Sequence, residues 1–221
     1  MKTTLLTLCF VLSFGFSFSQ SDSTKTKPIN VNYYIGFGLQ SADDFNLSSA
    51  LQNDEFPEIR TTDFEMSFGL TVQTPKSMYS LEWATSNSED DQNGYNYELS
   101  RNMIGLGYQY NLFKINQHKF NLGAQINYTF IENELYNTNS EADLANPSNL
   151  GELTKIDLNN WYLGPVMSFQ FNNKDLEPWL RLQVSYDFNL SQNSWDSDYT
   201  QLINTIEEDQ HMFRFQAIFP F

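Results

Sequence analysis

Apolar and polar residues alternate along eight separate runs of this chain, and this period of two constrains the fold more than any other feature. A period of two places the two sets on opposite faces of a β-strand. Each run has about the 9–11 residues of a tilted membrane strand, or somewhat more. The runs cover residues 29–40, 62–74, 77–86, 98–112, 119–131, 160–171, 177–190 and 211–221. The sequence therefore predicts an all-β protein of eight strands.

The two faces of these runs differ in size as well as in polarity. In one run, Phe120, Leu122, Ala124, Ile126, Tyr128 and Phe130 alternate with Asn121, Gly123, Gln125, Asn127 and Thr129. Large apolar side chains suit a surface that meets lipid, and small polar ones suit a narrow lumen. A soluble periplasmic β-sandwich also alternates and stays the alternative architecture. Pro165 lacks an amide donor, so we expect a bulge or a pairing fault in the sixth run.

The segments between the runs alternate in length. The long ones are 41–61, 87–97, 132–159 and 191–210, and the short ones are 75–76, 113–118 and 172–176. Outer-membrane barrels have short periplasmic turns, long extracellular loops and both termini in the periplasm. We therefore expect an eight-stranded antiparallel transmembrane up-and-down β-barrel over residues 29–221.

The N-terminus has the pattern of a signal peptide over residues 1–19. Lys2 precedes an apolar core, and Ser17 and Ser19 offer small residues for cleavage before Gln20. Residues 20–28 then form a flexible periplasmic lead. Cys9 lies within the signal, so the mature chain would contain no cysteine and no disulfide. The mean hydropathy of −0.47 does not argue against a barrel, which hides its apolar residues at every second position.

The C-terminus carries a resemblance to known proteins. The segment Phe213-Arg-Phe-Gln-Ala-Ile-Phe-Pro-Phe221 resembles the terminal signal of outer-membrane barrels, although Pro220 departs from the usual penultimate residue. The resemblance implies that the barrel-assembly machinery recognises Phe213, Phe215, Phe219 and Phe221. In strand number, loop order and terminus, residues 29–221 resemble the OmpA/OmpX-like class of small barrels, without a diagnostic internal motif. The Asn-, Tyr- and Phe-rich composition and the cleavage before Gln resemble secreted proteins of Bacteroidota.

Charged residues on the polar face predict the contents of the lumen. The inward set includes Glu65, Glu82, Arg101, Asp187 and Arg214. Opposite charges in a narrow lumen are expected to pair, which predicts a structural plug and no open pore. A gate or a small binding site within this network is the alternative.

Acidic residues gather in the predicted extracellular loops. They are Asp43, Asp44, Asp54, Glu55, Glu58, Glu89, Asp90, Asp91, Asp196, Asp198, Glu207, Glu208 and Asp209. Solvated charge is one interpretation, and contact with divalent cations that bridge to lipopolysaccharide phosphates is another. The segment from Glu89 to Gly94 partly matches a calcium loop, but it lacks the first Asp and has Ser100 in place of the bidentate Glu. The histidines and carboxylates form no recognisable transition-metal site, and no cofactor is expected.

Apolar and aromatic residues in or near the loops allow two interpretations. Helical spacing links Tyr199, Leu202, Ile203 and Ile206, and a similar pattern links Phe45, Leu47 and Leu51. These residues could pack the loops together or form a docking face for a protein partner. A membrane-interface girdle would account for Trp83, Tyr95, Tyr97, Trp161 and Trp195 at the outer strand ends and for Phe113 and Trp179 at the inner ends.

The first functional hypothesis is a non-enzymatic outer-membrane barrel that acts through its acidic extracellular loops. Its role would be adhesion, contact with lipopolysaccharide or cations, or that of an accessory subunit of an outer-membrane complex. A net charge of −15 argues against nucleic acid as a partner. The alternative is a lipid-modifying enzyme that uses His211 near Asp209, although no serine stands two residues from His211. His118 falls in a periplasmic turn.

Overall fold

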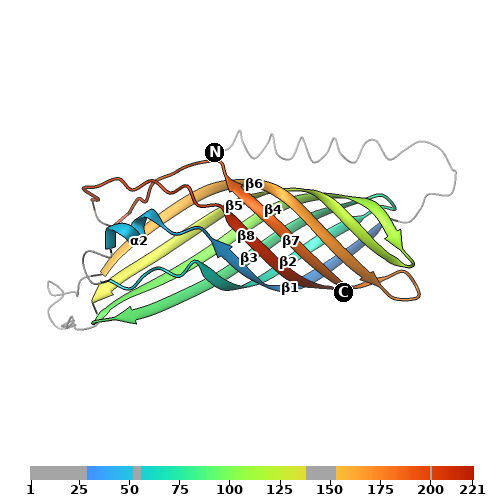
Figure 1. Ribbon diagram of the computed structural model, residues 1–221, viewed down its shortest axis with the longest axis horizontal. Coiled ribbons are helices and arrows are strands. Elements are labelled where there is room, and N and C mark those ends of the chain that lie inside the picture. Colours follow the sequence, from blue (N-terminus) through green and yellow to red (C-terminus); the bar gives the residue numbers. More distant parts are fainter. Residues whose placement is uncertain (1–28, 52–55, 138–152, 200) are drawn as a thin grey trace.

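A closed barrel of eight antiparallel strands forms the fold in the computed structural model, which describes residues 29–51, 56–137, 153–199 and 201–221 (Figure 1). The predicted signal peptide and lead lie outside these residues. Each strand pairs with its neighbours in sequence, and β1 closes onto β8. The strands are β1 (Asn30–Ala42), β2 (Thr62–Gln73), β3 (Ser77–Gln92), β4 (Tyr95–Ile115), β5 (His118–Asn137), β6 (Leu153–Asn172), β7 (Pro178–Asn189) and β8 (Met212–Pro220). This topology confirms the predicted up-and-down barrel and excludes the β-sandwich.

One short helix, α2 (Asn46–Leu51), follows β1 and lies at the end of the barrel that carries the long loops (Figure 1). We call this the outer end, and the end with the short turns the inner end. Among the described residues, no helix is long and apolar enough to cross a membrane.

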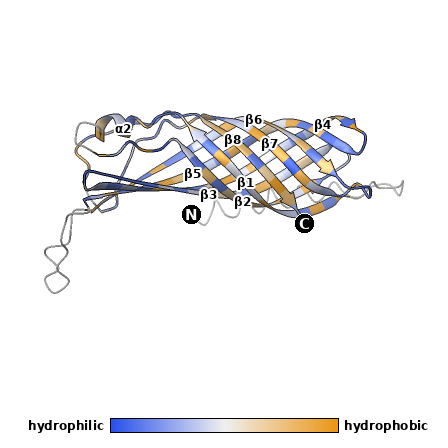
Figure 2. Cartoon of the chain, turned by 60° about the horizontal axis from the view of Figure 1, so that its bottom comes forward, coloured by the Kyte–Doolittle hydropathy of each residue, from blue (hydrophilic) through white to orange (hydrophobic). Residues whose placement is uncertain are grey.

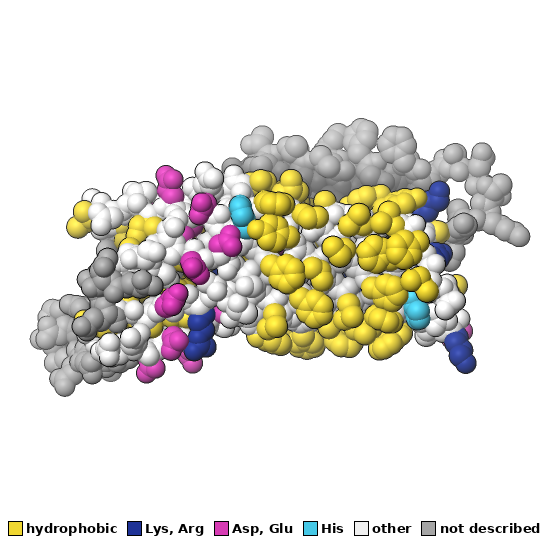
Figure 3. All heavy atoms as spheres, viewed as in Figure 1, with side chains coloured by type: hydrophobic (Ala, Val, Ile, Leu, Met, Phe, Trp, Pro, Cys, Tyr) yellow, Lys and Arg dark blue, Asp and Glu magenta, His cyan; other side chains and the backbone are white. Residues whose placement is uncertain are grey.

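Exposed apolar side chains of all eight strands form a belt around the barrel over its inner part, and Figure 3 shows one face of it. Apolar and polar residues alternate along each strand within it, as Figure 2 shows. The belt includes Tyr33, Phe37, Phe64, Phe68, Leu81, Leu106, Tyr108, Leu122, Ile126, Leu163, Phe188 and Phe215, all exposed on the outside. Four residues predicted for the aromatic girdles, Trp83, Trp161, Phe113 and Trp179, are exposed on this surface as well. A continuous apolar band of this kind is what a bilayer requires of a barrel wall.

Strands β3 to β6 extend beyond their predicted outer ends. The long loop predicted at 87–97 is wrong, because β3 and β4 continue to a two-residue turn at Asn93 and Gly94. Both turn residues have positive φ, 55° and 85°, which is the geometry that an Asn-Gly hairpin turn favours. The partial match to a calcium loop is wrong for the same reason, since Glu89 to Gln92 belong to β3.

The extended parts of β4 to β6 keep their alternation but exchange the polarity of their two faces, whereas the extension of β3 is polar on both faces. Along β5 the outward residues change from Ile126 and Phe130 to Glu132, which is half-buried beyond the belt. The inward residues change at the same level from Asn127 to Ile131. Lipid gives way to water on the outside at this point, so polar residues become favourable there and apolar ones inside. The sequence pattern therefore changes at the membrane surface although the strand does not end.

Pro165 produces a local pairing fault without a bulge. The β6–β7 ladder pairs Leu163 with Phe188 and Val166 with Ser185, and it skips the two positions between them in an unchanged register. On the other side of β6, pairing with β5 continues through Pro165. The absence of an amide N–H at Pro165 therefore interrupts the ladder on the β7 side of β6 and not on the β5 side.

Substitutions on the outward face of β4 test the position of the belt. Leu106, which is 58% exposed, lies within the belt, and Glu98 lies on the same face beyond it. We expect Leu106→Arg to lower the free energy of unfolding in liposomes by about 2–4 kcal/mol, because the charge would face lipid. Glu98→Arg is the control and is expected not to destabilise the barrel. Glu98 lies opposite Glu89 and Glu134 on the adjacent strands, so the substitution replaces a like charge by an opposite one. A similar loss in denaturant titrations of both variants would contradict this position.

Candidate functional site

A buried ion network inside the barrel is centred on Arg214 of β8. Its guanidinium donates to both carboxylate oxygens of Glu65, at 2.9 Å from Nε and 2.8 Å from a terminal nitrogen. The same terminal nitrogen donates to Glu82 Oε1 at 2.6 Å. Arg214 is 1% exposed. One guanidinium fork thus ties β2, β3 and β8 together across the lumen.

Tyr34 extends this network to β1. Its hydroxyl donates to Glu82 Oε2 at 2.9 Å, and its ring centroid lies 5.1 Å from the guanidinium carbon of Arg181. The ring lies against Gly69, its partner in the β1–β2 ladder, where the Cβ of any other residue would overlap it. Glycine is therefore required at this position, because the tyrosine ring occupies the space that a side chain would need.

Three of the five predicted luminal charges meet in direct ion pairs, and the other two have different partners. Arg101 lies 3.5 Å from Asp63 Oδ2, an aspartate that the sequence did not single out. The amide of Gln40 lies between Arg101 and Glu65, with its nitrogen 3.1 Å from Glu65 Oε2 and its oxygen toward Arg101. Arg101 is thus joined to the network through an amide.

Asp187, the fifth predicted charge, is held by amides. Its carboxylate oxygens accept hydrogen bonds from Gln125 Nε2 and Asn127 Nδ2, each at 3.0 Å. The carboxylate therefore has hydrogen-bond donors on β5 without a guanidinium in contact with it.

Glutamine side chains cross the remaining lumen. Gln109 donates to Gln183 at 3.1 Å, and Gln183 donates in turn to Gln216 at 3.1 Å. Gln73 donates to Gln170 at 3.0 Å. The first and last of these bonds join strands that are not neighbours, so side chains fill the lumen, as an eight-stranded barrel allows.

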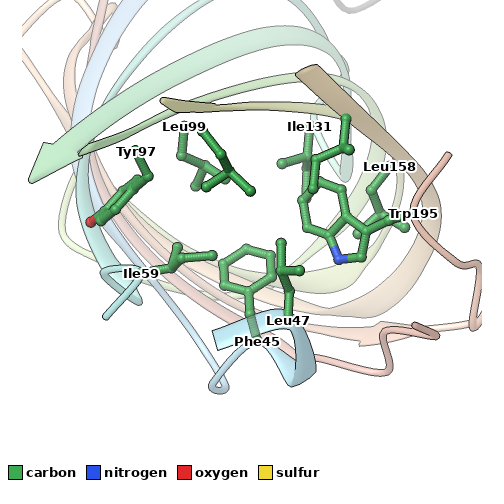
Figure 4. Close-up of a cluster of buried hydrophobic side chains, with 10 residues drawn as sticks. Phe45, Leu47, Ile59, Tyr97, Leu99, Ile131, Leu158 and Trp195 are labelled. Atoms are coloured by element: carbon green, nitrogen blue, oxygen red, sulfur yellow. The ribbon is translucent and has the colours of Figure 1, made fainter. Parts of the chain in front are cut away.

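A second core, which we call the cap core, lies at the outer end beyond the belt (Figure 4). It consists of Phe45, Leu47, Ile59, Tyr97, Leu99, Ile131, Leu135, Ile156, Leu158 and Trp195. These residues come from the extended ends of β4, β5 and β6 and from the first and fourth loops. Burial of each large apolar side chain contributes about 1.5–3 kcal/mol, so the cap core can hold the loops in one arrangement.

Sequence reasoning located only part of the cap core. Tyr97 and Trp195 were predicted for a lipid-facing girdle, which is wrong because both are buried in the cap core. The first-loop helix is present as α2, but the described residues of the predicted fourth-loop helix form no helix. Leu202 and Ile206 nevertheless pack on the cap core, whereas Ile203 is 97% exposed.

Glu208 ties the two cap loops together. Its carboxylate accepts hydrogen bonds from the backbone amides of Asn46 and Leu47 in α2, at 2.8 and 3.0 Å. It also accepts from the Trp195 indole at 2.7 Å and from Gln210 Nε2 at 3.0 Å. Burial raises the pKa of Glu208 above its ordinary value, against the opposing effect of the bonds from Trp195 and the α2 backbone. One carboxylate thus satisfies amides of the first turn of α2 and fixes the fourth loop to it.

Acidic side chains gather on the outside of the cap (Figure 3). A groove of about 1010 Å³ lies there, between the outer faces of β4 to β6 and the β7–β8 loop. Its carboxylates are Glu132, Asp157, Asp196 and Asp198. Lys155 pairs with Glu132 beside the groove. Burial, and then the charge of Glu132, raise the pKa of Asp157, while Lys155 acts in the opposite direction.

The other predicted acidic residues do not converge on one point. Asp90 pairs with Arg60 at 3.0 Å, and Asp43 Oδ2 accepts from the backbone amide of His211 at 3.0 Å. Residues 54 and 55 lie outside the described part of the chain. Within the described part, no group of three or more acidic, histidine or cysteine side chains is close enough to hold a metal ion.

Both histidines accept a hydrogen bond from a backbone amide of a neighbouring strand. His211 Nδ1 accepts from Asn189 N–H, and His118 Nδ1 accepts from Asn172 N–H, each at 3.2 Å. A catalytic serine–histidine–carboxylate chain would need the histidine nitrogens for its own partners. Among the described residues, no serine or carboxylate side chain is hydrogen-bonded to either ring. These bonds give both histidines a structural role at the strand ends.

The four terminal phenylalanines lie on the outside of the barrel. Phe213, Phe215 and Phe219 point outward from β8, and Phe221 is exposed at the chain end. Their recognition by the barrel-assembly machinery stays a proposal.

No known family model matches this chain, and no curated protein matches it. The crystal structure of Ail, the attachment invasion locus protein of Yersinia pestis, is similar with a TM-score of 0.50 and 8% identity, over 86% of this chain and 97% of that chain. Neisserial surface protein A is similar with a TM-score of 0.50 and 11% identity, over 88% and 98%. OprG from Pseudomonas aeruginosa aligns with a TM-score of 0.46 and 13% identity, over 90% and 99%.

At these identities the likeness concerns the fold alone. The chain has the fold of the small eight-stranded outer-membrane barrels. This fold and the apolar belt together support a location in a bacterial outer membrane. The comparisons lend no support to an origin in Bacteroidota.

Replacing Arg214 tests the ion network. In Arg214→Leu, Glu65 and Glu82 would stay buried without a cationic partner, which costs about 3–5 kcal/mol for a buried pair. We expect the free energy of unfolding in liposomes to fall by that amount. Arg60→Leu is the control: it breaks the exposed pair with Asp90 and should cost about 1 kcal/mol or less. Equal losses would mean that the luminal pairs contribute no more than a surface pair.

Replacing Glu208 tests the link between the cap loops. Glu208→Ala would leave two α2 amides and the Trp195 indole without their acceptor, at about 1–3 kcal/mol for each buried group. We expect faster cleavage of the loops by proteinase K, while the barrel still migrates as a folded species on unboiled gels. Glu207→Ala is the matched control, because Glu207 accepts the hydrogen bond from Asn46 through its backbone carbonyl, which the substitution keeps. Identical cleavage rates for both variants would show that Glu208 does not hold the cap.

Proposed function

We propose that this protein is a non-enzymatic outer-membrane barrel that is closed to solutes and displays an ordered acidic cap for binding positively charged partners outside the cell. The observation that carries the proposal is the cap core, which is separate from the membrane-spanning part. Loops that only connected strands would not need four buried apolar residues, Phe45, Leu47, Ile59 and Trp195, packed against the six that the strand ends supply.

The filled lumen supports a role at the surface rather than in transport. Ion pairs and amide bonds cross the lumen at several levels, so a solute would have to break them to pass. The buried charges inside nearly balance, with Asp63, Glu65, Glu82 and Asp187 against Arg101, Arg181 and Arg214.

Most of the net charge of −15 for the whole chain therefore lies outside the lumen. Acidic side chains are prominent on the cap, beyond the belt (Figure 3). An acidic surface attracts positively charged ligands and repels phosphate groups. Direct contact with lipopolysaccharide phosphates would need bridging cations, whereas a basic protein surface would bind without them. A basic partner in the same membrane or on another cell fits this surface.

An experiment with purified protein in nanodiscs separates an ordered cap from net charge alone. Trp195→Ala removes a cap-core side chain that is 5% exposed and leaves the charge unchanged. We expect its binding to a polylysine-coated sensor to be about tenfold weaker than that of the unmodified protein, because multivalent contacts need charges held in one geometry. Heparin, a polyanion, should not bind either protein.

Trp179→Ala is the matched control, because Trp179 lies on the outside near the inner end. It should bind polylysine as the unmodified protein does. Equal binding by both variants would contradict a role for the ordered cap, and a large steady conductance across planar bilayers would contradict the closed lumen.

A further inference from the structure

The groove on the outside of the cap has the chemistry of a binding site. It lies between the β7–β8 loop and strands β4 to β6, and its volume of about 1010 Å³ is in the upper range of ligand pockets. We propose that this groove binds a basic, extended segment of a partner protein. The proposal rests on the proposed function of the cap as a binding surface.

The charge of the groove is complementary to that of a basic segment. Four carboxylates line the groove. The basic residue of β6 is Lys155, which lies two positions from Asp157 along the strand. Lys155 is already engaged with Glu132 and lies 3.6 Å from Glu134. Among the described residues, Asp157 and Asp198 take part in no ion pair. A ligand with positive charges would supply the opposite charge that the protein does not place beside these carboxylates.

The four groove carboxylates are distributed over several elements of the structure. They come from two different strands and from the loop, and the described residues contain no compact set that could hold a single metal ion. Spread charges in a groove match several positive groups along a chain better than one small cation.

The rest of the groove lining suits a peptide backbone. Amide and hydroxyl side chains, among them Asn102, Asn159 and Asn204, can bond the backbone groups of an extended peptide. Ile203 adjoins the groove residues Leu202 and Asn204 and is 97% exposed, and Tyr199 is 74% exposed. Exposed apolar side chains beside a polar groove suit contact with apolar residues of a protein. A neutral polysaccharide would offer no positive charge, and a phosphate headgroup would be repelled.

Fluorescence anisotropy with a labelled short oligolysine tests the proposal on the full protein in nanodiscs. The variant Asp157→Asn with Asp198→Asn removes two groove charges and keeps the shape of both side chains. The variant Glu89→Gln with Asp91→Asn removes two exposed charges from the outer end of β3, outside the groove. We expect the groove variant to bind about tenfold or more weakly and the control less than about twofold, because charge contacts decay within a Debye length. Binding should also weaken as the salt rises from about 0.05 to about 0.5 M.

Three outcomes would overturn the proposal. Equal losses in the two variants would show that acidic charge over the whole cap binds the peptide, in which case the proposed function stands and the groove does not. Tighter binding of a neutral oligosaccharide such as maltoheptaose would assign the groove to a different ligand. If oligolysine does not bind the unmodified protein while the polylysine sensor does, the groove is not a peptide site. Unboiled gels and proteinase K digestion confirm that both variants keep the folded barrel and cap.

Discussion

A strand needs apolar residues on its outer face only where it meets lipid, and β4 to β6 exchange the polarity of their two faces where they pass into water. The structure of this protein depends on that exchange. Within the belt, apolar residues face outward and polar residues fill the lumen, as Leu106 and Gln109 show on β4. Beyond the belt, Leu99 faces inward and Glu98 faces water on the same strand. The barrel wall is continuous across this boundary, because hydrogen bonding between strands does not depend on which face is apolar.

The two halves of the barrel are consequently stabilised by different interactions. Inside the belt, the lumen is held by ion pairs and amide bonds, with Arg214 at their centre. At the outer end, the hydrophobic effect operates as in a soluble protein, and the cap core packs α2 and the fourth loop onto the strand ends. Glu208 adds the polar contacts that fix one loop to the other. Closure of the lumen and ordering of the cap are the two features on which the proposed binding role of the outer surface rests.

The contents of the lumen could be predicted from strand parity to a large extent. Parity alone places Glu65, Glu82 and Arg214 inside, and Arg181 and Asp63 share that parity although they were not singled out. Tyr34 was missed because an aromatic residue is expected on the lipid side, yet it fills the space that Gly69 leaves open. The Asn-Gly pair at 93–94 is a strong hairpin signal, and it would have revealed that β3 and β4 continue.

The sequence by itself determined the number of strands, their order and direction, and which face of each strand meets the lipid within the belt. Local alternation of apolar and polar residues encodes these features, because the face on which a side chain lies depends on its position along its own strand. Only the tertiary structure decided the partners of the buried charges, the true lengths of β3 to β6, and the union of Phe45, Trp195 and the strand ends in the cap core. Those contacts join residues far apart in the chain, so they depend on how the closed barrel brings strands and loops together, which no local pattern records.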